Sequence, residues 1–334
     1  MPSLVTGATG IVGSQIVRQL LEKNRKVRIL VRDGSNRTAL TQLMKFHNLS
    51  ADLLEEVRGD VLDPVSLDRA IDGCDVVYHA AALVSFHPRD IALMHETNVK
   101  GTANIVDACL RHEVDALAYV SSTAAIGDGR VEGMQREDSP WTTDKGKSQY
   151  ALTKRYAELE VMRGHQEGLN IGVVNPGIII GPGKWGASST SMITACTNGM
   201  TFYPPGSNGF SDARDVAAFL IHIIDSGWFG KRCLLINENL TFKEVFRAIC
   251  EKLNTRTPAI ELPAWLIRAA GAVMLPLELV GVSFGSVTAH SLWSSARSVK
   301  FSSIHLEDSG FALKHSIAEA VDYTVNVFRA THGN

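Results

Sequence analysis

The sequence predicts an α/β fold: a doubly wound parallel sheet of the Rossmann type with a smaller, mostly helical substrate lobe. Two observations predict it. Short apolar runs alternate with amphipathic stretches through the N-terminal half of the chain, which is typical of strand–helix–strand units. A glycine-rich turn follows the first apolar run and opens the first amphipathic stretch, as in folds that bind dinucleotides.

The expected strands are mostly continuous apolar runs, as are strands covered on both faces. They span residues 4–6, 27–31, 55–58, 76–79, 116–121, 171–175 and 233–236. Amphipathic patterns predict helices at residues 12–22, 67–71, 91–110, 148–163 and 213–224.

The second half of the chain predicts a separate lobe. Residues 177–209 are rich in Gly, Ser, Pro and Asn, which favours irregular loops around a binding site. Beyond Thr241 the pattern is mostly helical. We therefore expect a dinucleotide-binding domain from residues 1–180 and 210–240, and a substrate-binding lobe from residues 181–209 and 241–334.

Composition narrows the class of protein. The 334 residues include 33 Lys plus Arg and 35 Asp plus Glu, a net charge of −2, so neither a nucleic acid nor a membrane is expected as a partner. The most apolar stretch, residues 262–282, is interrupted by prolines and charged residues.

Five dispersed cysteines show no metal-ligand spacing and fit a reducing compartment. No signal peptide is expected, and the protein is predicted to be cytoplasmic without a metal site.

The glycine-rich turn is the first candidate cofactor site. Gly7, Gly10 and Gly13 follow the spacing Gly-x-x-Gly-x-x-Gly, with Thr9 and Ile11 between them. Glycines at this spacing allow a sharp bend, a close approach to a pyrophosphate and tight helix packing. The following helix N-terminus offers free N–H groups to the phosphates.

The end of the second strand indicates which dinucleotide binds. An NAD site usually has an acidic residue there to bind the ribose hydroxyls. The chain has Val31 at that position and Arg32 next to it, and a guanidinium suits a 2′-phosphate. Arg37 is a second candidate for the phosphate, and Asp33 is the ribose acid if the register is shifted by two residues. NADP(H) is therefore favoured over NAD(H).

Asp60 and Val61 end the third strand and are candidates for the adenine end of the cofactor. The Asp60 carboxylate is a suitable acceptor for the adenine amino group. The alternative is that Asp60 caps the helix that starts near Pro64, since Asp is also a favoured cap.

A tyrosine and a lysine four residues apart indicate proton transfer. Tyr150 and Lys154 open a long helix and share one of its faces. A nearby ammonium and an oxidised nicotinamide would lower the phenol pKa, which makes the phenol a usable general acid or base. Ser122 and Thr123 follow the strand at 116–121, where the carboxyl end of the sheet binds ligands. Either hydroxyl is a candidate for binding a substrate carbonyl.

With these motifs in order, the sequence resembles the extended short-chain dehydrogenase/reductase family, which includes the NAD-dependent epimerases and dehydratases. The Arg32 pattern looks most like the dihydroflavonol reductase, cinnamoyl-CoA reductase and 3-beta-hydroxysteroid dehydrogenase branch. The resemblance implies a triad of Thr123, Tyr150 and Lys154, with Ser122 as the alternative hydroxyl. It also implies that Asn98 supports the active site through water and that Ala80, Ala81, Ala82, Pro176 and Gly177 line the cofactor.

The resulting hypothesis is reversible reduction of a ketone or aldehyde, with NADPH as hydride donor and Tyr150 as proton donor. One rival is an NAD-dependent nucleotide-sugar epimerase or dehydratase on the same fold. Another is a non-catalytic NADP(H)-binding sensor, against which the Tyr150–Lys154 pair argues. The resemblance also implies a homodimer through the helices at 91–110 and 148–163, although the branch includes monomers.

Overall fold

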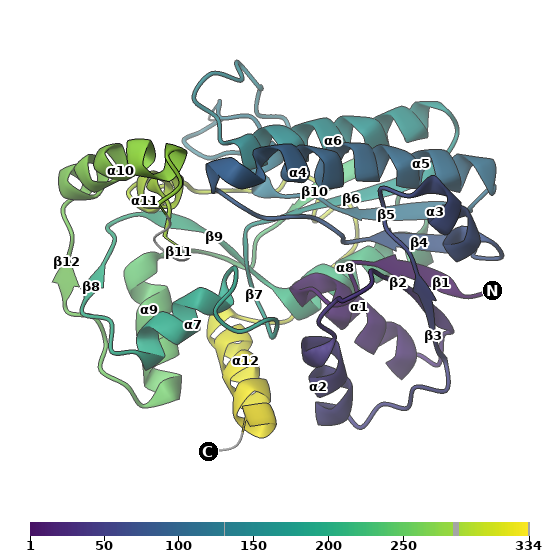
Figure 1. The fold of residues 1–334 in the computed structure, drawn as a ribbon, viewed down its shortest axis with the longest axis horizontal. Coiled ribbons are helices and arrows are strands. Elements are labelled where there is room, and N and C mark those ends of the chain that lie inside the picture. Colours follow the sequence, from purple (N-terminus) through teal and green to yellow (C-terminus); the bar gives the residue numbers. More distant parts are fainter. Residues whose placement is uncertain (130, 283–286, 333–334) are drawn as a thin grey trace.

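The computed structural model describes residues 1–129, 131–282 and 287–332. A parallel sheet of seven strands forms its centre, in the order β10-β6-β5-β4-β1-β2-β3 (Figure 1). The strands are β1 (Ser3–Thr6), β2 (Val27–Val31), β3 (Leu54–Arg58), β4 (Val76–His79), β5 (Ala116–Val120), β6 (Asn170–Pro176) and β10 (Lys231–Leu235). The strand order reverses between β1 and β4, and in sheets of this kind ligands bind at that switch point.

Helices cover both faces of the sheet, which confirms the doubly wound prediction (Figure 1). One face carries α1 (Ile11–Glu22) and α8 (Ala213–Ser226), with α2 (Thr38–Phe46) beside α1. The opposite face carries α3 (Pro64–Ile71), α5 (Gly101–Arg111) and α6 (Gln149–Gln166).

Neighbouring side chains along each strand enter different cores. Val5 and Tyr78 pack with α1 and α8, whereas Leu4 and Val77 pack with α3, α5 and α6. This alternation follows from the period of two along a strand, and it explains why the strands read as continuous apolar runs. β3 is the exception, because it lies at the sheet edge and exposes Glu55 and Glu56.

The remaining elements gather at one end of the sheet, on the left of Figure 1. A three-stranded sheet contains β7 (Ile178–Ile180), β9 (Ser207–Asp212) and β11 (Glu238–Thr241), and β8 (Phe202–Tyr203) pairs with β12 (Ile260–Glu261). The helices there are α7 (Thr190–Thr197), α9 (Phe242–Leu253), α10 (Ala264–Leu279), α11 (Ala289–Ser295) and α12 (Ile317–His332).

The last helix connects this end to the first residues of the chain. α12 packs against α9 and α2. The Tyr323 hydroxyl lies 3.1 Å from Gln15 Nε2 and 2.8 Å from His47 Nε2, and the Arg214 guanidinium lies over its ring at 4.6 Å.

The expectation of irregular loops across residues 177–209 was wrong in part. β7, α7, β8 and the start of β9 lie within this segment. These elements are stabilised by contacts with residues far along the chain. β7 and β9 pair with each other, and Ile193 and Cys196 of α7 enter a core formed largely by α9 and α12. Gly and Ser content is a local signal and does not report such partners.

The predicted helix at 91–110 is interrupted. A short 3₁₀ turn (Pro88–Asp90) leads into α4 (Ile91–His95), then a π-helical turn (Glu96–Lys100), then α5. A π-turn adds one residue to a helical turn and is often found at functional sites. Asn98 lies inside it.

Residues 262–282 mostly form α10, most of which is solvent-exposed. Within the described part of the chain, no helix combines the length and the apolar character that crossing a membrane would require.

Candidate active site

The glycine-rich turn is built at the switch point as the spacing predicts. Gly7 has a left-handed φ of +70°, and a Cβ there would lie 2.5 Å from the backbone nitrogen of Ala81. A Cβ on Gly13 would lie 2.1 Å from the Gly7 carbonyl oxygen. Gly10 caps α1, which begins at Ile11. Any larger residue at position 7 or 13 would push the turn away from the sheet, so this backbone fits close approach by a pyrophosphate.

A chain of hydrogen bonds fixes the segment after β4. The Thr6 hydroxyl lies 2.6 Å from His79 Nδ1, and His79 Nε2 lies 3.0 Å from the Thr102 hydroxyl. Thr102 in turn donates to the Asn98 carbonyl at 2.6 Å. Since Thr102 donates there, His79 Nε2 is the donor to Thr102 and Nδ1 accepts from Thr6. Burial, helped by the Lys154 charge, lowers the pKa of His79 to about 3 and keeps the ring neutral.

The Asn98 side chain is bound directly to protein atoms. Its Oδ1 accepts from the Leu83 N–H at 2.7 Å, and its Nδ2 donates to the Leu83 carbonyl at 3.0 Å and to the Thr153 hydroxyl at 3.1 Å. Asn98 therefore holds the chain that follows Ala80, Ala81 and Ala82. Its contribution to the active site through water stays a prediction.

Tyr150, Ser122 and Thr123 lie together beyond the carboxyl end of β5. Tyr150 is partly buried near the start of α6, and the Ser122 hydroxyl lies close enough to its phenol to act on the phenol pKa. Ser122 also caps the short 3₁₀ turn that Thr123 begins, by accepting from the Ala124 N–H at 3.1 Å. Of the two candidate hydroxyls, Ser122 is the one that contacts Tyr150.

Lys154 follows one helical turn later and is almost entirely buried. Its ammonium donates to the Tyr119 hydroxyl and to the Val120 carbonyl, each at 2.8 Å. Burial lowers the pKa of Lys154 to about 7, although the Glu158 carboxylate opposes this shift.

The expected lowering of the Tyr150 pKa does not follow from these contacts. Burial raises the pKa of Tyr150, and the Ser122 hydrogen bond opposes the rise. Lys154 bonds to Tyr119 and Val120 and is itself only partly protonated near neutral pH, so it gives the phenolate little support. A phenol with a raised pKa stays protonated at neutral pH, which is the form that donates a proton.

Glu158 was missed by the sequence analysis. It is 1% exposed and lies a further helical turn along the same face of α6. Its carboxylate accepts from Ser121 at 2.6 Å, from Asn175 at 2.7 Å and from Arg232 at 2.8 Å. The spacing Tyr-x-x-x-Lys-x-x-x-Glu was visible, but the partner Arg232 is far away in the sequence and gave no signal.

Pro176 and Gly177 lie where β6 ends, next to this cluster. The Gly177 N–H donates to the Ser211 hydroxyl at 2.9 Å, and a Cβ on Gly177 would lie 2.1 Å from the Gly209 carbonyl oxygen. These contacts place Gly177 against β9. Binding of the cofactor by Pro176 and Gly177 stays a prediction.

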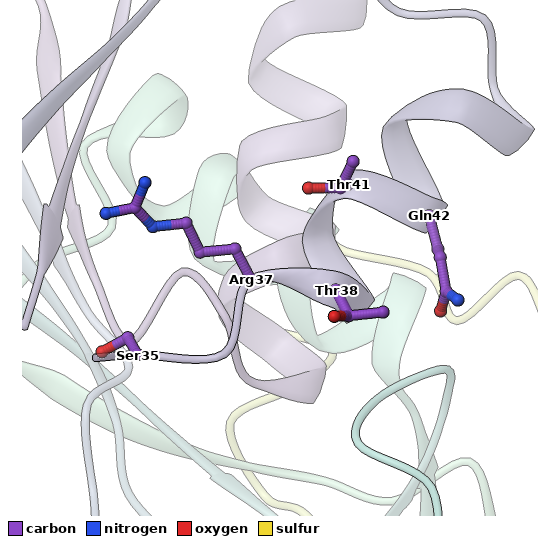
Figure 2. A pocket seen from close by; sticks show the side chains of 5 residues that line it. All are labelled: Ser35, Arg37, Thr38, Thr41 and Gln42. Atoms are coloured by element: carbon purple, nitrogen blue, oxygen red, sulfur yellow. The ribbon is translucent and has the colours of Figure 1, made fainter. Parts of the chain in front are cut away.

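The segment after β2 forms a hollow of about 430 Å³ lined by Ser35, Arg37, Thr38, Thr41 and Gln42. Figure 2 shows Thr38, Thr41 and Gln42 on α2, with the Arg37 side chain extending to the side on which Ser35 lies. Arg37 Nη1 pairs with Glu56 at 2.6 Å, while its buried Nε has no hydrogen-bond partner among the described residues.

Arg32 lies immediately beyond β2 and is exposed, with no ion pair among the described residues. The neighbouring Asp33 is exposed too and lies 3.8 Å from Arg58. β2 ends at Val31, as the sequence predicted.

Asp60 does not cap the helix near Pro64. Its carboxylate accepts from the Leu62 N–H at 2.9 Å, and Asp63 is the cap, accepting from Val65 at 3.1 Å. The two aspartates differ by three positions, which is within the uncertainty of locating a helix start from sequence. Val61 is buried, and its carbonyl accepts from Asn104 of α5 at 2.9 Å.

Comparison with known proteins agrees with this fold. The sequence profile described as the NAD dependent epimerase/dehydratase family matches residues 3–231. The chain is 29% identical to "Sterol demethylase protein B" of Methylococcus capsulatus, over 83% of this chain and 82% of that protein. It is 31% identical to a putative dihydroflavonol 4-reductase of Synechocystis, over 78% of this chain and 75% of that protein. The crystal structure titled gox2253 superposes with a TM-score of 0.82 at 30% identity, covering 99% of this chain and 98% of that one.

Proposed function

Because the chain belongs to the NAD-dependent epimerase/dehydratase family, we propose that it is an NADP(H)-dependent oxidoreductase that reduces a ketone or an aldehyde. The family and the named reductases make it an NAD(P)-dependent enzyme of the extended short-chain dehydrogenase/reductase type. The observation that carries the proposal is the contact between Tyr150 and Ser122 at the carboxyl end of the sheet, one helical turn from the buried Lys154.

The residues at this site suit proton donation to a carbonyl. A nicotinamide cofactor bound here would supply the hydride chemistry for the carbonyl carbon. Tyr150, whose raised pKa keeps it protonated, donates its proton to the carbonyl oxygen as the alkoxide develops. Ser122 or Thr123 donates a hydrogen bond to the same oxygen. Lys154 would hold the nicotinamide ribose, and Tyr119 and the Val120 carbonyl position its ammonium.

Two observations support NADP(H) over NAD(H). Among the described residues, Arg32 at the end of β2 has no ion pair, and the buried Nε of Arg37, beside the hollow at the start of α2, has no hydrogen-bond partner. A 2′-phosphate is a suitable partner for the exposed guanidinium of Arg32. Asp33, the candidate for a ribose acid, lies next to Arg58 instead.

The first experiment is a titration of the purified protein with NADPH and NADH, followed by protein fluorescence, after denaturing a sample to look for retained nucleotide. Reversible binding with a preference for NADPH is the expected result. Tightly retained NAD would overturn the proposal and favour an epimerase or dehydratase, because those reactions return the hydride to the same cofactor molecule.

Turnover separates an enzyme from a nucleotide sensor. Tyr150→Phe should bind NADPH as the unmodified protein does and lose at least about 100-fold in kcat, the usual contribution of a general acid. Substantial residual carbonyl reduction in that variant would contradict the role of Tyr150.

The resemblance also carries the proposal of a homodimer through α4–α6. Leu93 on α4 and Leu159 on α6 are 50% and 46% exposed. Light scattering behind size exclusion should then give a dimer mass for the protein and a monomer mass for Leu159→Glu. A monomer at micromolar concentration would contradict the dimer and leave the reductase proposal untouched.

A further inference from the structure

A cavity of about 240 Å³ lies beside the reaction centre, between the loop before α6 and helix α11. Its lining residues are Gly146, Lys147, His290, Trp293, Ser294 and Arg297. None of these residues was selected by the sequence analysis, and none takes part in the chemistry derived above.

Aromatic contacts connect this cavity to Tyr150. The Phe86 ring meets the Tyr150 ring edge-on, with centroids 5.8 Å apart. Phe86 also stacks on His290, with centroids 5.2 Å apart and an interplanar angle of 20°. Phe86 is 37% exposed. A flat or apolar substrate body lying on Phe86 would therefore have one end at Tyr150 and the other at the cavity.

The charge of the cavity is set by Arg297. Lys147 is neutralised by Asp128 at 3.1 Å, and its ammonium also lies over Trp141. Burial, together with the Arg297 charge, lowers the pKa of His290, so this ring is neutral at neutral pH. Arg297 is exposed and has no hydrogen bond or ion pair from its side chain among the described residues.

Nearby carboxylates do not compensate this charge. Asp128 is bound to Lys147 and also accepts from Thr142 at 3.2 Å. Asp144 accepts from Trp141 and Tyr156, each at 2.7 Å. The cavity thus offers one unpaired guanidinium, a serine hydroxyl at Ser294 and the ring of Trp293.

We propose that this cavity binds an anionic group of the substrate, a carboxylate or a phosphate, while the substrate carbonyl lies at Tyr150. The inference rests on the proposed reductase function and specifies its substrate class: a carbonyl compound with an apolar or planar body and an acidic end. A guanidinium binds either anion through paired, charge-assisted hydrogen bonds, and the Trp293 and Phe86 rings cover the body.

The activity test uses 4-formylcinnamate and its methyl ester, which carry the same aldehyde with and without the charge. The acid should have a kcat/KM with NADPH at least about tenfold above that of the ester, the effect of one charge-assisted hydrogen bond. Arg297→Gln should remove this preference by lowering kcat/KM for the acid alone, and Arg297→Lys should restore part of it. Arg268→Gln, which changes an exposed arginine outside the cavity, is the matched control and should keep the preference.

A binding test decides the inference even if no aldehyde is reduced. Calorimetric titration of the protein with saturating NADP⁺ would compare cinnamate, phenyl phosphate and methyl cinnamate. Tighter binding of cinnamate or of phenyl phosphate, lost in Arg297→Gln and kept in Arg268→Gln, supports the anion site and tells the two anions apart. Equal binding of all three probes, or equal effects of Arg297→Gln on acid and ester, would overturn it. Absence of any NADPH-dependent reduction would instead contradict the proposed function.

Discussion

Lys154 and Tyr119 are joined by a buried hydrogen bond of 2.8 Å, and the ammonium also lies 4.5 Å from the centre of the Tyr119 ring. Tyr119 stacks in turn on His79, with centroids 5.5 Å apart. The position of the lysine is therefore set from the sheet side, by β5 and β4, as well as by its own helix. The same burial that fixes the position of the lysine lowers its pKa, so that it is only partly protonated near neutral pH.

The depressed pKa of Lys154 predicts a pH-dependent stability. Its pKa is about 7 in the folded protein and 10.5 in the usual reference state, so between these pH values the unfolded chain binds more protons. The free energy of unfolding should then rise with pH across this window. The stabilisation gained at high pH, where Lys154 is neutral in both states, should be lost as pH falls through 7. The size expected between pH 7 and pH 10 is on the order of 3 kcal/mol.

Denaturant unfolding of Lys154→Met at several pH values tests this slope. The variant should lack that part of the rise, whereas Lys45→Met, which changes an exposed lysine, should keep it. Parallel pH dependences for all three proteins would contradict the buried-lysine account. A difference in stability between the three proteins that is the same at every pH would not contradict it, because the packing of the Met side chain is independent of pH.

Glu158 is predicted to act as a positioning residue for Lys154. Glu158→Gln removes the negative charge that supports the ammonium and leaves the Arg232 guanidinium without its carboxylate. The variant should lose about 2–3 kcal/mol of stability, as expected when one partner of a largely buried charged hydrogen bond is removed. The pH profile of kcat/KM should also shift, because the pKa of Lys154 falls further.

Glu160→Gln is the matched control for that change, since Glu160 pairs with Arg163 at the protein surface. It should alter neither the stability by more than about 0.5 kcal/mol nor the pH profile. If Glu158→Gln lowered the stability but left the pH profile in place, Glu158 would be a structural residue alone.

Ser122, which contacts Tyr150, is predicted to contribute more to catalysis than Thr123. Ser122→Ala should lower kcat by about 10- to 100-fold, because the carbonyl oxygen and the tyrosine both lose a hydrogen-bond partner. Thr123→Val, which keeps the side-chain shape, should have a smaller effect. Steady-state kinetics of both variants, with melting temperatures as a folding control, distinguish them, and a larger loss in Thr123→Val would reverse the assignment.

Arg32→Asp should change the cofactor preference. Replacing the guanidinium by a carboxylate should raise the Kd for NADPH by at least tenfold through lost hydrogen bonds and like-charge repulsion, with little change for NADH. Fluorescence titrations with both nucleotides measure this directly. Arg69→Asp on the exposed side of α3 provides the control for a change in net charge, and an unaltered NADPH affinity in Arg32→Asp would remove Arg32 from the site.

Local sequence patterns predicted part of the fold and of the candidate site. The turn around Gly7 and Gly13, the register of β2 and the shared helical face of Tyr150 and Lys154 all depend on residues close together in sequence. The structure confirms the doubly wound parallel sheet that such units imply, because parallel connections allow few alternative topologies.

The remaining features depend on contacts between distant segments. Nothing near Asn98 in the sequence indicates that Leu83 and Thr153 bind its amide, or that the helix must form a π-turn there. The same holds for Arg232, which reaches Glu158 from the edge strand β10. The direction of the Lys154 ammonium is a further example: helical spacing predicts that it lies near Tyr150, but not that it hydrogen-bonds Tyr119 and Val120.

The contact of α12 with the start of the chain bears on how the protein is made. Gln15 and His47 find their partner Tyr323 only after nearly the whole chain has been synthesised. At about 5–20 residues per second, tens of seconds separate the two events. During that time the surfaces of α1 and α2 that α12 covers in the native protein stay exposed to solvent. These native contacts can therefore form only near the end of synthesis.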